Sequence, residues 1–146
     1  MNNVKSFHAL IFILLLIIPF ALQAQSCDCQ SFRDGLFESY DKTFGKSIIE
    51  RRGKWQIEYS ELTKTKVLLK VKWIDDCNYT LKLIRILENP YHMELKKKII
   101  LHVQIIETSE NMYKHRSSCE KPEFAMEGTF TRTEGPGLFN KPPKKD

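Results

Sequence analysis

The chain has 146 residues, of which 42% are hydrophobic and 28% are charged, and its formal net charge is +5. This length supports one hydrophobic core and excludes two, and the charge is only mildly basic. No repeat of fixed period occurs, which excludes a repeat architecture.

The first segment is typical of a bacterial-type secretory signal peptide. A basic start with Lys5 precedes an uncharged, mainly apolar run from Ala9 to Leu22. This run is shorter than the roughly 18 residues of an ordinary membrane-spanning helix, and Ala24 supplies the small residue that signal peptidase requires. We therefore expect residues 1–24 to be a signal-peptide helix removed after Ala24, which would make the protein periplasmic or secreted.

Two alternatives compete with cleavage after Ala24. An uncleaved anchor is disfavoured by the short apolar run and by the helix-bending Pro19. A lipoprotein signal is the other alternative, because a small residue, Ser26, directly precedes Cys27. In that case Cys27 would be lipidated and would tether the protein to the outer membrane.

Cleavage would remove 24 of 146 residues and leave 122, and with the loss of Lys5 the net charge would fall from +5 to +4. We expect residues 25–133 to form a single β domain. Residues 134–146 are rich in glycine, proline and lysine. They are expected to be a flexible basic tail, because proline and lysine neither pair in a sheet nor become buried.

Within the β domain, apolar and polar residues alternate with period two, as in strands with one buried face. The clearest strand runs from Lys66 to Trp73, with lysines between apolar residues. Turn-forming residues 75–78 separate it from the alternating run Tyr79–Leu83, so the two runs predict an antiparallel hairpin. The same pattern predicts strands over Gly35–Tyr40, Ser47–Arg52, Lys54–Ser60, Ile99–Glu107, Tyr113–Ser118 and Phe124–Phe130.

These seven or eight short strands with short turns favour an all-β antiparallel meander. Such a set closes into a barrel or folds into two packed sheets. We expect a small lipocalin-like barrel or half-barrel, with a β-sandwich as the alternative that the strand count leaves open. Residues Asn89–Lys98 could hold one helical turn.

The alternation also predicts which side chains face the interior. In a small barrel such residues more often fill the core than leave a cavity, and few of them are polar, so the pattern gives little support for a ligand site. The predicted inward residues are Trp55, Ile57, Tyr59, Val67, Leu69, Val71, Trp73, Tyr79, Leu81, Leu101, Val103, Phe124 and Met126.

All four cysteines follow the expected cleavage site and would reach a compartment where disulfides persist. Cys27 and Cys29 are one residue apart and would form a strained ring together. Each is therefore expected to reach a distant partner, Cys77 or Cys119, which leaves two connectivities open. Zinc is disfavoured, because the chain has no paired Cys-x-x-Cys.

No catalytic constellation stands out. An enzyme acting on envelope material would require His102 or His115 to converge with Glu107 or Asp75. The Asp75-Asp76 pair is interpreted as hydrated turn residues. We therefore expect a protein that is not an enzyme and that holds neither cofactor nor metal. The histidines interpreted as ordinary surface residues are His92, His102 and His115.

The lysines on the predicted outer faces could form a nucleic-acid-binding surface. However, Trp73 lies on the face opposite the lysines, with the core, so the lysine face lacks that ring for stacking. Outward lysines are usually a solvated face that discourages edge pairing. We expect no nucleic acid partner, and anionic lipid or polysaccharide suits an exported basic protein better.

The segment Val71–Leu81, with Phe32–Phe37 before it and Val103–Thr108 after it, resembles a family of short exported bacterial proteins of unassigned function. Members of that family share a Trp-x-x-x-Cys-x-Tyr hairpin, here Trp73 to Tyr79. The resemblance covers most of the mature chain. It implies a shared fold and export, and it implies no activity.

The same resemblance implies a disulfide between Cys29 and Cys77. Cys27 and Cys119 would then be additions in this chain, able to bridge each other. Lipidation of Cys27 would instead leave Cys119 without a disulfide partner.

Export, one β domain and the absence of a catalytic constellation together predict an exported, non-enzymatic envelope or secreted module that binds a ligand or an envelope protein. One alternative is the enzyme described above. The other is a structural or inhibitory protein that acts through its surface. Neither the ligand, the partner nor the oligomeric state follows from the sequence.

Overall fold

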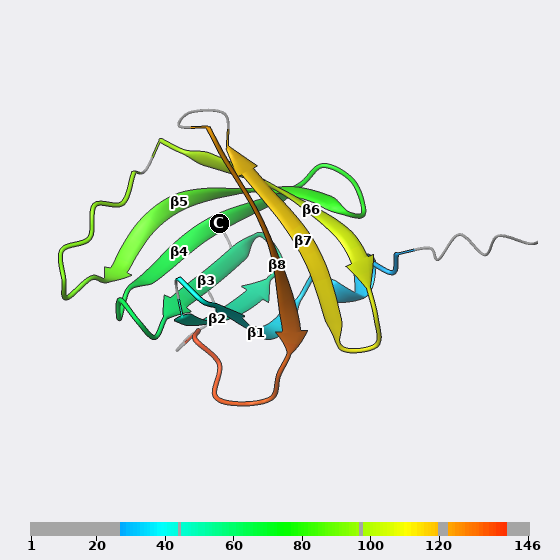
Figure 1. Cartoon of the computed structure of the whole chain (residues 1–146), viewed down its shortest axis with the longest axis horizontal. Coiled ribbons are helices and arrows are strands. Elements are labelled where there is room, and N and C mark those ends of the chain that lie inside the picture. Colours follow the sequence, from blue (N-terminus) through cyan, green and yellow to red (C-terminus); the bar gives the residue numbers. More distant parts are fainter. Residues whose placement is uncertain (1–26, 44, 97, 120–122, 140–146) are drawn as a thin grey trace, which may run out of the picture.

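The computed structural model describes residues 27–43, 45–96, 98–119 and 123–139. Eight strands follow one another as an antiparallel meander, and the last pairs with the first, so the sheet closes into a barrel (Figure 1). A short 3-10 turn, η1 (Gln30–Phe32), precedes them. The strands are β1 (Gly35–Asp41), β2 (Gly45–Arg52), β3 (Trp55–Ser60), β4 (Lys66–Trp73), β5 (Asn78–Glu88), β6 (Ile100–Thr108), β7 (Met112–Cys119) and β8 (Phe124–Arg132).

The predicted all-β barrel is confirmed, and the sandwich alternative is wrong. The predicted helical turn within Asn89–Lys98 is also wrong, because the described residues of this segment form an irregular loop between β5 and β6. The expected signal-peptide helix over 1–24 lies outside the described residues. Among the residues that are described, no helix is long and apolar enough to cross a membrane.

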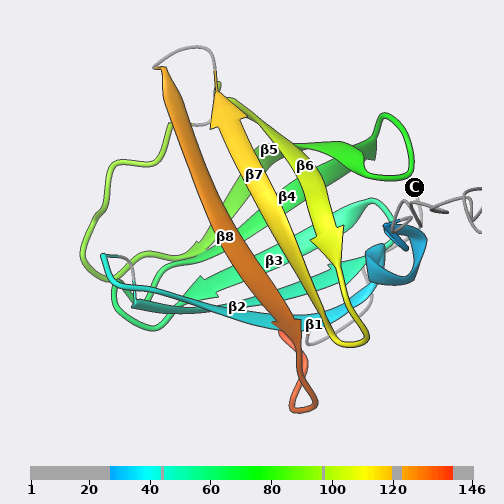
Figure 2. The same ribbon diagram turned by 45° about the vertical axis from the view of Figure 1, so that its right-hand side comes forward.

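The barrel closes unevenly. Strand β1 pairs with β8 only at Phe37 with Arg132 and Glu38 with Thr131, near the start of β1 and the end of β8. Figure 2 shows β8 running obliquely across the barrel toward β1. The two strands therefore meet at one end of the barrel, here called the closed end, and separate toward the other, here called the open end.

The β2–β3 hairpin decides which side chains of β3 enter the barrel. Gly53 in its turn has a φ of 55°, which glycine adopts readily, and Arg51 pairs with Gln56 across it. Because Arg51 is fully buried inside the barrel, its partner Gln56 faces the interior, and so does Glu58 two residues on. The predicted inward residues Trp55, Ile57 and Tyr59 therefore face outward.

The reason for this error is that both faces of β3 are covered. The segment after β8 crosses the outer face of the sheet, where the N–H groups of Leu138 and Phe139 donate to a carboxylate oxygen of Glu50. Glu50 is buried and is the cross-strand neighbour of Ile57. β3 therefore carries apolar residues on its outer face. The alternation of apolar and polar residues does not show which face of this strand points into the barrel.

This contact involves the segment over 134–146 that the sequence predicts to be a flexible basic tail. Its described part, up to Phe139, is held against the barrel by the bonds to Glu50, with the Arg52 guanidinium 5.2 Å from the Phe139 ring centre. Residues 140–146 lie outside the described part. The other predicted inward residues found in or against the core are Val67, Leu69, Val71, Trp73, Tyr79, Leu81, Leu101 and Val103.

The closed end is built around the guanidinium of Arg51, which is completely buried. It donates four hydrogen bonds, and aromatic rings surround its apolar faces. An unpaired charge buried this deeply would cost several kcal/mol, so the surrounding acceptors are what make the site stable. The acceptors are Gln56 Oε1 at 2.7 Å, the Phe32 carbonyl at 3.0 Å, the Tyr79 hydroxyl at 2.9 Å and the Tyr113 hydroxyl at 3.0 Å.

A second arginine seals this end from outside. The Arg132 guanidinium lies 5.3 Å from the Phe32 ring centre and 5.2 Å from that of Phe37, and it donates to the carbonyl of Ser31. Phe32 and Phe37 are themselves buried. The turn η1 is thereby fixed as a lid across the closed end.

A disulfide between Cys29 and Cys77 ties this lid to the β4–β5 hairpin, which confirms the pairing that the family resemblance implied. The bridge spans 48 residues, and in the chain-entropy account it stabilises the fold by on the order of 4 kcal/mol. The second bridge that this pairing would allow, between Cys27 and Cys119, is not formed. Cys27 contacts the Ile106 carbonyl at the closed end, whereas Cys119 ends β7 at the open end.

Replacing Arg51 by methionine should destabilise the protein strongly. The substitution leaves two tyrosine hydroxyls, one amide oxygen and one carbonyl without their buried donor, and each such group costs about 1–3 kcal/mol. We expect the free energy of unfolding to fall by at least about 3 kcal/mol, measured by urea denaturation with circular dichroism.

Arg116 is the matched control, because its guanidinium is exposed and pairs with Glu127 on the outer face. Arg116→Met should cost no more than about 1 kcal/mol. Equal losses for the two variants would show that burial of the Arg51 charge does not organise the closed end.

Candidate functional site

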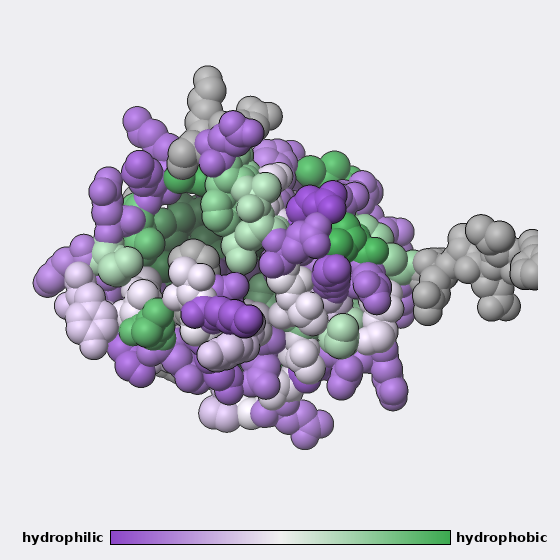
Figure 3. Space-filling view, viewed as in Figure 1, coloured by the Kyte–Doolittle hydropathy of each residue, from purple (hydrophilic) through white to green (hydrophobic). Residues whose placement is uncertain are grey.

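The barrel contains a cavity of about 260 Å³. Figure 3 shows the molecule hollowed in its left half, with hydrophobic side chains inside the hollow and mostly hydrophilic ones around it. Ser39 and Asp41 of β1 and Thr129 of β8 line the cavity on the side where these two strands have separated. Its apolar wall is made by Ile49, Leu81, Leu101, Val103, Met126 and Phe130.

A second cavity of about 240 Å³ adjoins the first and shares Glu58, Leu81 and Leu101 with it. The β5–β6 loop covers this second space through Leu95, Lys96 and Ile99. Its remaining lining is Val67, Leu69 and Leu83. The interior is therefore a chamber in two parts, one with several polar groups and one whose lining is apolar except for Glu58 and Lys96.

The interior is more polar than the sequence pattern predicted. The expectation of few polar inward groups is wrong for two reasons: the β2–β3 register turns two polar residues of β3 inward, and β7 carries a polar inward face. The polar side chains that line the first cavity include Ser39, Ser47, Gln56, Glu58, His115 and Ser117.

Three of the inward polar groups form a line from the closed end to the cavity. Arg51 Nε donates to Gln56 Oε1 at 2.7 Å, and Gln56 Nε2 donates to Glu58 Oε1 at 2.5 Å. The amide of Gln56 thus separates the guanidinium from the carboxylate and contacts both. Hydrogen bonds that polarise one another in this way strengthen each other in a low dielectric.

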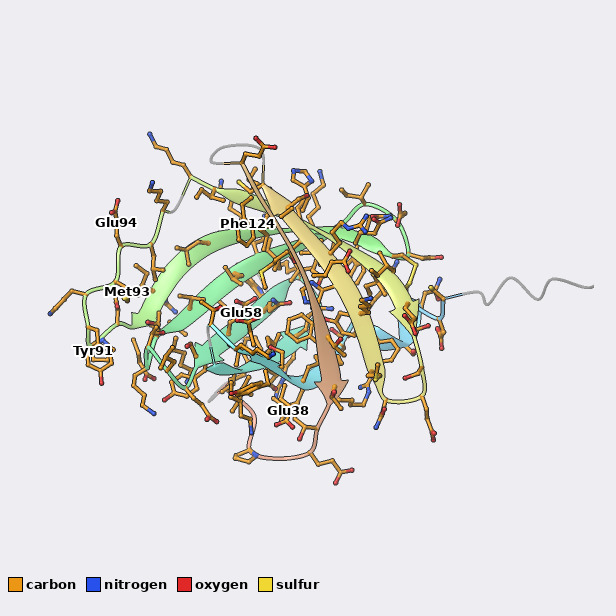
Figure 4. The ribbon with its side chains drawn as sticks, viewed as in Figure 1. Glu38, Glu58, Tyr91, Met93, Glu94 and Phe124 are labelled. Atoms are coloured by element: carbon orange, nitrogen blue, oxygen red, sulfur yellow. A yellow bond between two sulfur atoms is a disulfide. The ribbon has the colours of Figure 1, made fainter. Side chains whose placement is uncertain are left out.

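Glu58 is the carboxyl group at the cavity end of this line. It lies inside the barrel (Figure 4), and the surface that it exposes faces the two cavities that it lines. Burial raises the pKa of Glu58, while the hydrogen bond from Gln56 and the positive charge of Arg51 oppose that rise. Among the described residues, no hydrogen-bond partner contacts its second oxygen, Oε2.

His115 lies on the opposite wall, on β7. It is 5% exposed, its Nδ1 lies 3.0 Å from the Ser117 hydroxyl, and its ring stacks on Phe130 at 4.5 Å. Burial, helped by the positive charge of Arg51 and opposed by Glu127, lowers the pKa of His115 to about 4. The ring is therefore neutral at physiological pH.

Gly128 makes room for this ring. It is the cross-strand partner of His115, and a Cβ at this position would lie 2.9 Å from His115 Nε2. A side chain at position 128 would collide with the ring. The imidazole can therefore lie flat against β8 because this residue is glycine.

The structure corrects one of the three histidine predictions. His92 lies exposed in the β5–β6 loop and His102 on the outer face of β6, as expected. His115 is not a surface residue. The inward position of His115 could have been predicted from its alternation with Tyr113 and Ser117 along β7, because Tyr113 is a core residue.

Glu107 does not converge with either histidine of the enzyme hypothesis. His115 faces the interior, whereas Glu107 is exposed on the far side of the sheet. His102 and Glu107 are five residues apart on β6, a separation of roughly 16 Å along a strand. Asp75 instead accepts hydrogen bonds from the backbone N–H groups of Cys77 and Asn78 within its turn, and these bonds lower its pKa.

Within the described residues, no group of three or more histidine, cysteine or acidic side chains is arranged to hold a metal ion. Comparison with protein-family models, with curated proteins and with solved structures found no match for this chain. The geometry of the chamber is therefore what indicates its chemistry.

His115 should make the protein sensitive to acid. Because its folded pKa of about 4 lies below the ordinary value of 6.5, the unfolded chain binds the proton more tightly. The stability contributed by the neutral ring is present above about pH 6.5 and is lost as the pH falls toward 4, with a total on the order of 3 kcal/mol.

The measurement is urea denaturation between pH 7 and 4 for the wild-type protein and for His115→Gln. The contribution of Glu58 to stability changes with pH in the opposite direction, since its raised pKa favours the folded state in acid. This contribution is common to both proteins. The wild-type protein should lose more stability than the variant. Parallel pH profiles would mean that protonation of His115 is not linked to unfolding.

Proposed function

We propose that this protein is an exported, non-enzymatic binding protein that holds a small amphipathic molecule inside its barrel. The observation that carries this proposal is the two-part chamber, with polar groups on one side and apolar walls on the other. Small-molecule sites typically combine an apolar lining with a few convergent polar groups. A surface-acting structural or inhibitory protein would have no need for a hollow interior.

The side chains around the open end also suit an apolar ligand. Tyr91 and Met93, in the β5–β6 loop, and Phe124, at the start of β8, are exposed apolar side chains in this part of the molecule (Figure 4). Because the loop that carries Tyr91 and Met93 also covers the second cavity, its movement would open a route into the apolar half of the chamber.

The contact between Ser117 and His115 is the feature closest to a nucleophile and its base. Three observations weigh against hydrolysis there. The lowered pKa makes His115 a weak base, its Nε2 abuts Gly128 where a triad would place an orienting acid, and both side chains are buried. We therefore assign this contact to the wall of the binding chamber.

A phenylalanine that projects into the chamber should abolish binding. Ser47 lines the cavity and is partly exposed to it, so Ser47→Phe fills space without replacing a core residue. We expect the wild-type protein to bind the uncharged fluorophore N-phenylnaphthylamine, and the variant to bind it at least about tenfold more weakly, measured by fluorescence titration.

Ser118→Phe is the control, because Ser118 lies on the outer face of β7, next to the inward Ser117. It should bind the fluorophore as the wild-type protein does. Absence of binding by the wild-type protein, or equal binding by the two variants, would refute an interior site.

Export is the second element of the proposal, supported by the disulfide, which persists in oxidising compartments. The intact mass of the protein isolated from its own cells should begin at Gln25, and reduction should add two alkylatable thiols, those of Cys29 and Cys77. A mass beginning at Cys27 with acyl chains would make it a lipoprotein. A mass that retains residues 1–24 would refute processing.

A further inference from the structure

The carboxyl group of Glu58 is the polar feature that both halves of the chamber share. Its Oε1 is engaged by Gln56, and within the described residues its Oε2 has no hydrogen-bond donor. This oxygen faces the cavities that Glu58 lines, so it can accept a hydrogen bond from a bound molecule. The position of Glu58 at the junction of a polar and an apolar cavity suits the head group of an amphipathic molecule.

The charge of Arg51 is not available to a ligand in the same way. Its Nε and both Nη atoms donate to Gln56, Phe32, Tyr79 and Tyr113. Of these partners Gln56 and Tyr79 line the cavity, whereas Arg51 itself does not. An anionic head group would have to displace these bonds and would also meet the carboxylate of Glu58. Glu58 is therefore the charged group that both halves of the chamber share, and Lys96, on the β5–β6 loop, is a second charged side chain lining the apolar half.

We propose that the bound molecule carries an ammonium group, which donates to Glu58 Oε2 while its hydrocarbon body occupies the apolar cavity beneath the β5–β6 loop. This inference rests on the proposed function and specifies its ligand class. An ammonium ion complements a carboxylate more strongly than a neutral donor does, since charge-assisted hydrogen bonds are about twice as strong as neutral ones.

The test compares three eight-carbon ligands with different head groups: octylamine, octanol and octanoate. Isothermal titration calorimetry near neutral pH should give the order octylamine, then octanol, then octanoate, with the amine bound at least about tenfold more tightly than the alcohol. Glu58→Gln keeps the size of the side chain and an oxygen that can accept from Gln56. This variant should lose about tenfold in affinity for octylamine and keep its affinity for octanol.

Glu38→Gln is the matched control. Glu38 is a carboxylate on the outer face of β1, paired with Lys46 at 2.9 Å, and its substitution removes the same charge outside the chamber (Figure 4). It should leave all three affinities unchanged. A loss of octylamine binding in this variant equal to that in Glu58→Gln would mean that net charge, and not the interior carboxylate, attracts the amine.

The outcomes separate the two proposals. If octanoate binds as tightly as octylamine, or if Glu58→Gln weakens both octylamine and octanol equally, the ammonium inference is wrong and the binding function stands. If none of the three ligands binds the wild-type protein, both proposals are wrong.

Discussion

The buried guanidinium of Arg51 is the constraint on which the rest of this barrel depends. A charge that is taken out of water must be met by oriented acceptors, and here they come from η1, β3, β5 and β7. Satisfying this one group therefore joins segments from across the sequence at one end of the barrel. Arg132 and the Cys29–Cys77 disulfide act at the same end, where they hold the η1 lid.

Concentrating the polar and covalent constraints at the closed end leaves the open end less constrained. β1 and β8 share only two residue pairs, and the β5–β6 loop covers the chamber without regular structure. Segments with few backbone contacts open most easily, so the route to the interior belongs at this end. The hydrogen bonds from Arg51 through Gln56 to Glu58 connect the closed end with the cavity, so that polar groups extend from one to the other.

Much of the fold could be predicted from the sequence, but the site could not. Period-two alternation identified all eight strands, because a strand between core and water must alternate whatever its neighbours are. Alternation failed on β3, where Ile57 is buried on the outside beside Glu50 and the C-terminal segment. Because Ile57 and Tyr59 were expected to face inward, the pattern did not indicate that Glu58, which lies between them, lines the interior. His115 was expected on the surface for a different reason. The sequence does contain its alternation with Tyr113, but Tyr113 was not among the predicted inward residues.

The sequence by itself determined the secondary structure and the meander, because both follow from local periodicity and short turns. It also carried a resemblance that implied the Cys29–Cys77 bridge, which the structure contains. Only the tertiary structure decided that the barrel is hollow and which polar groups face the hollow. Those properties depend on the register of the β2–β3 hairpin and on the segment that covers the outer face at Glu50, and the alternation of apolar and polar residues reveals neither.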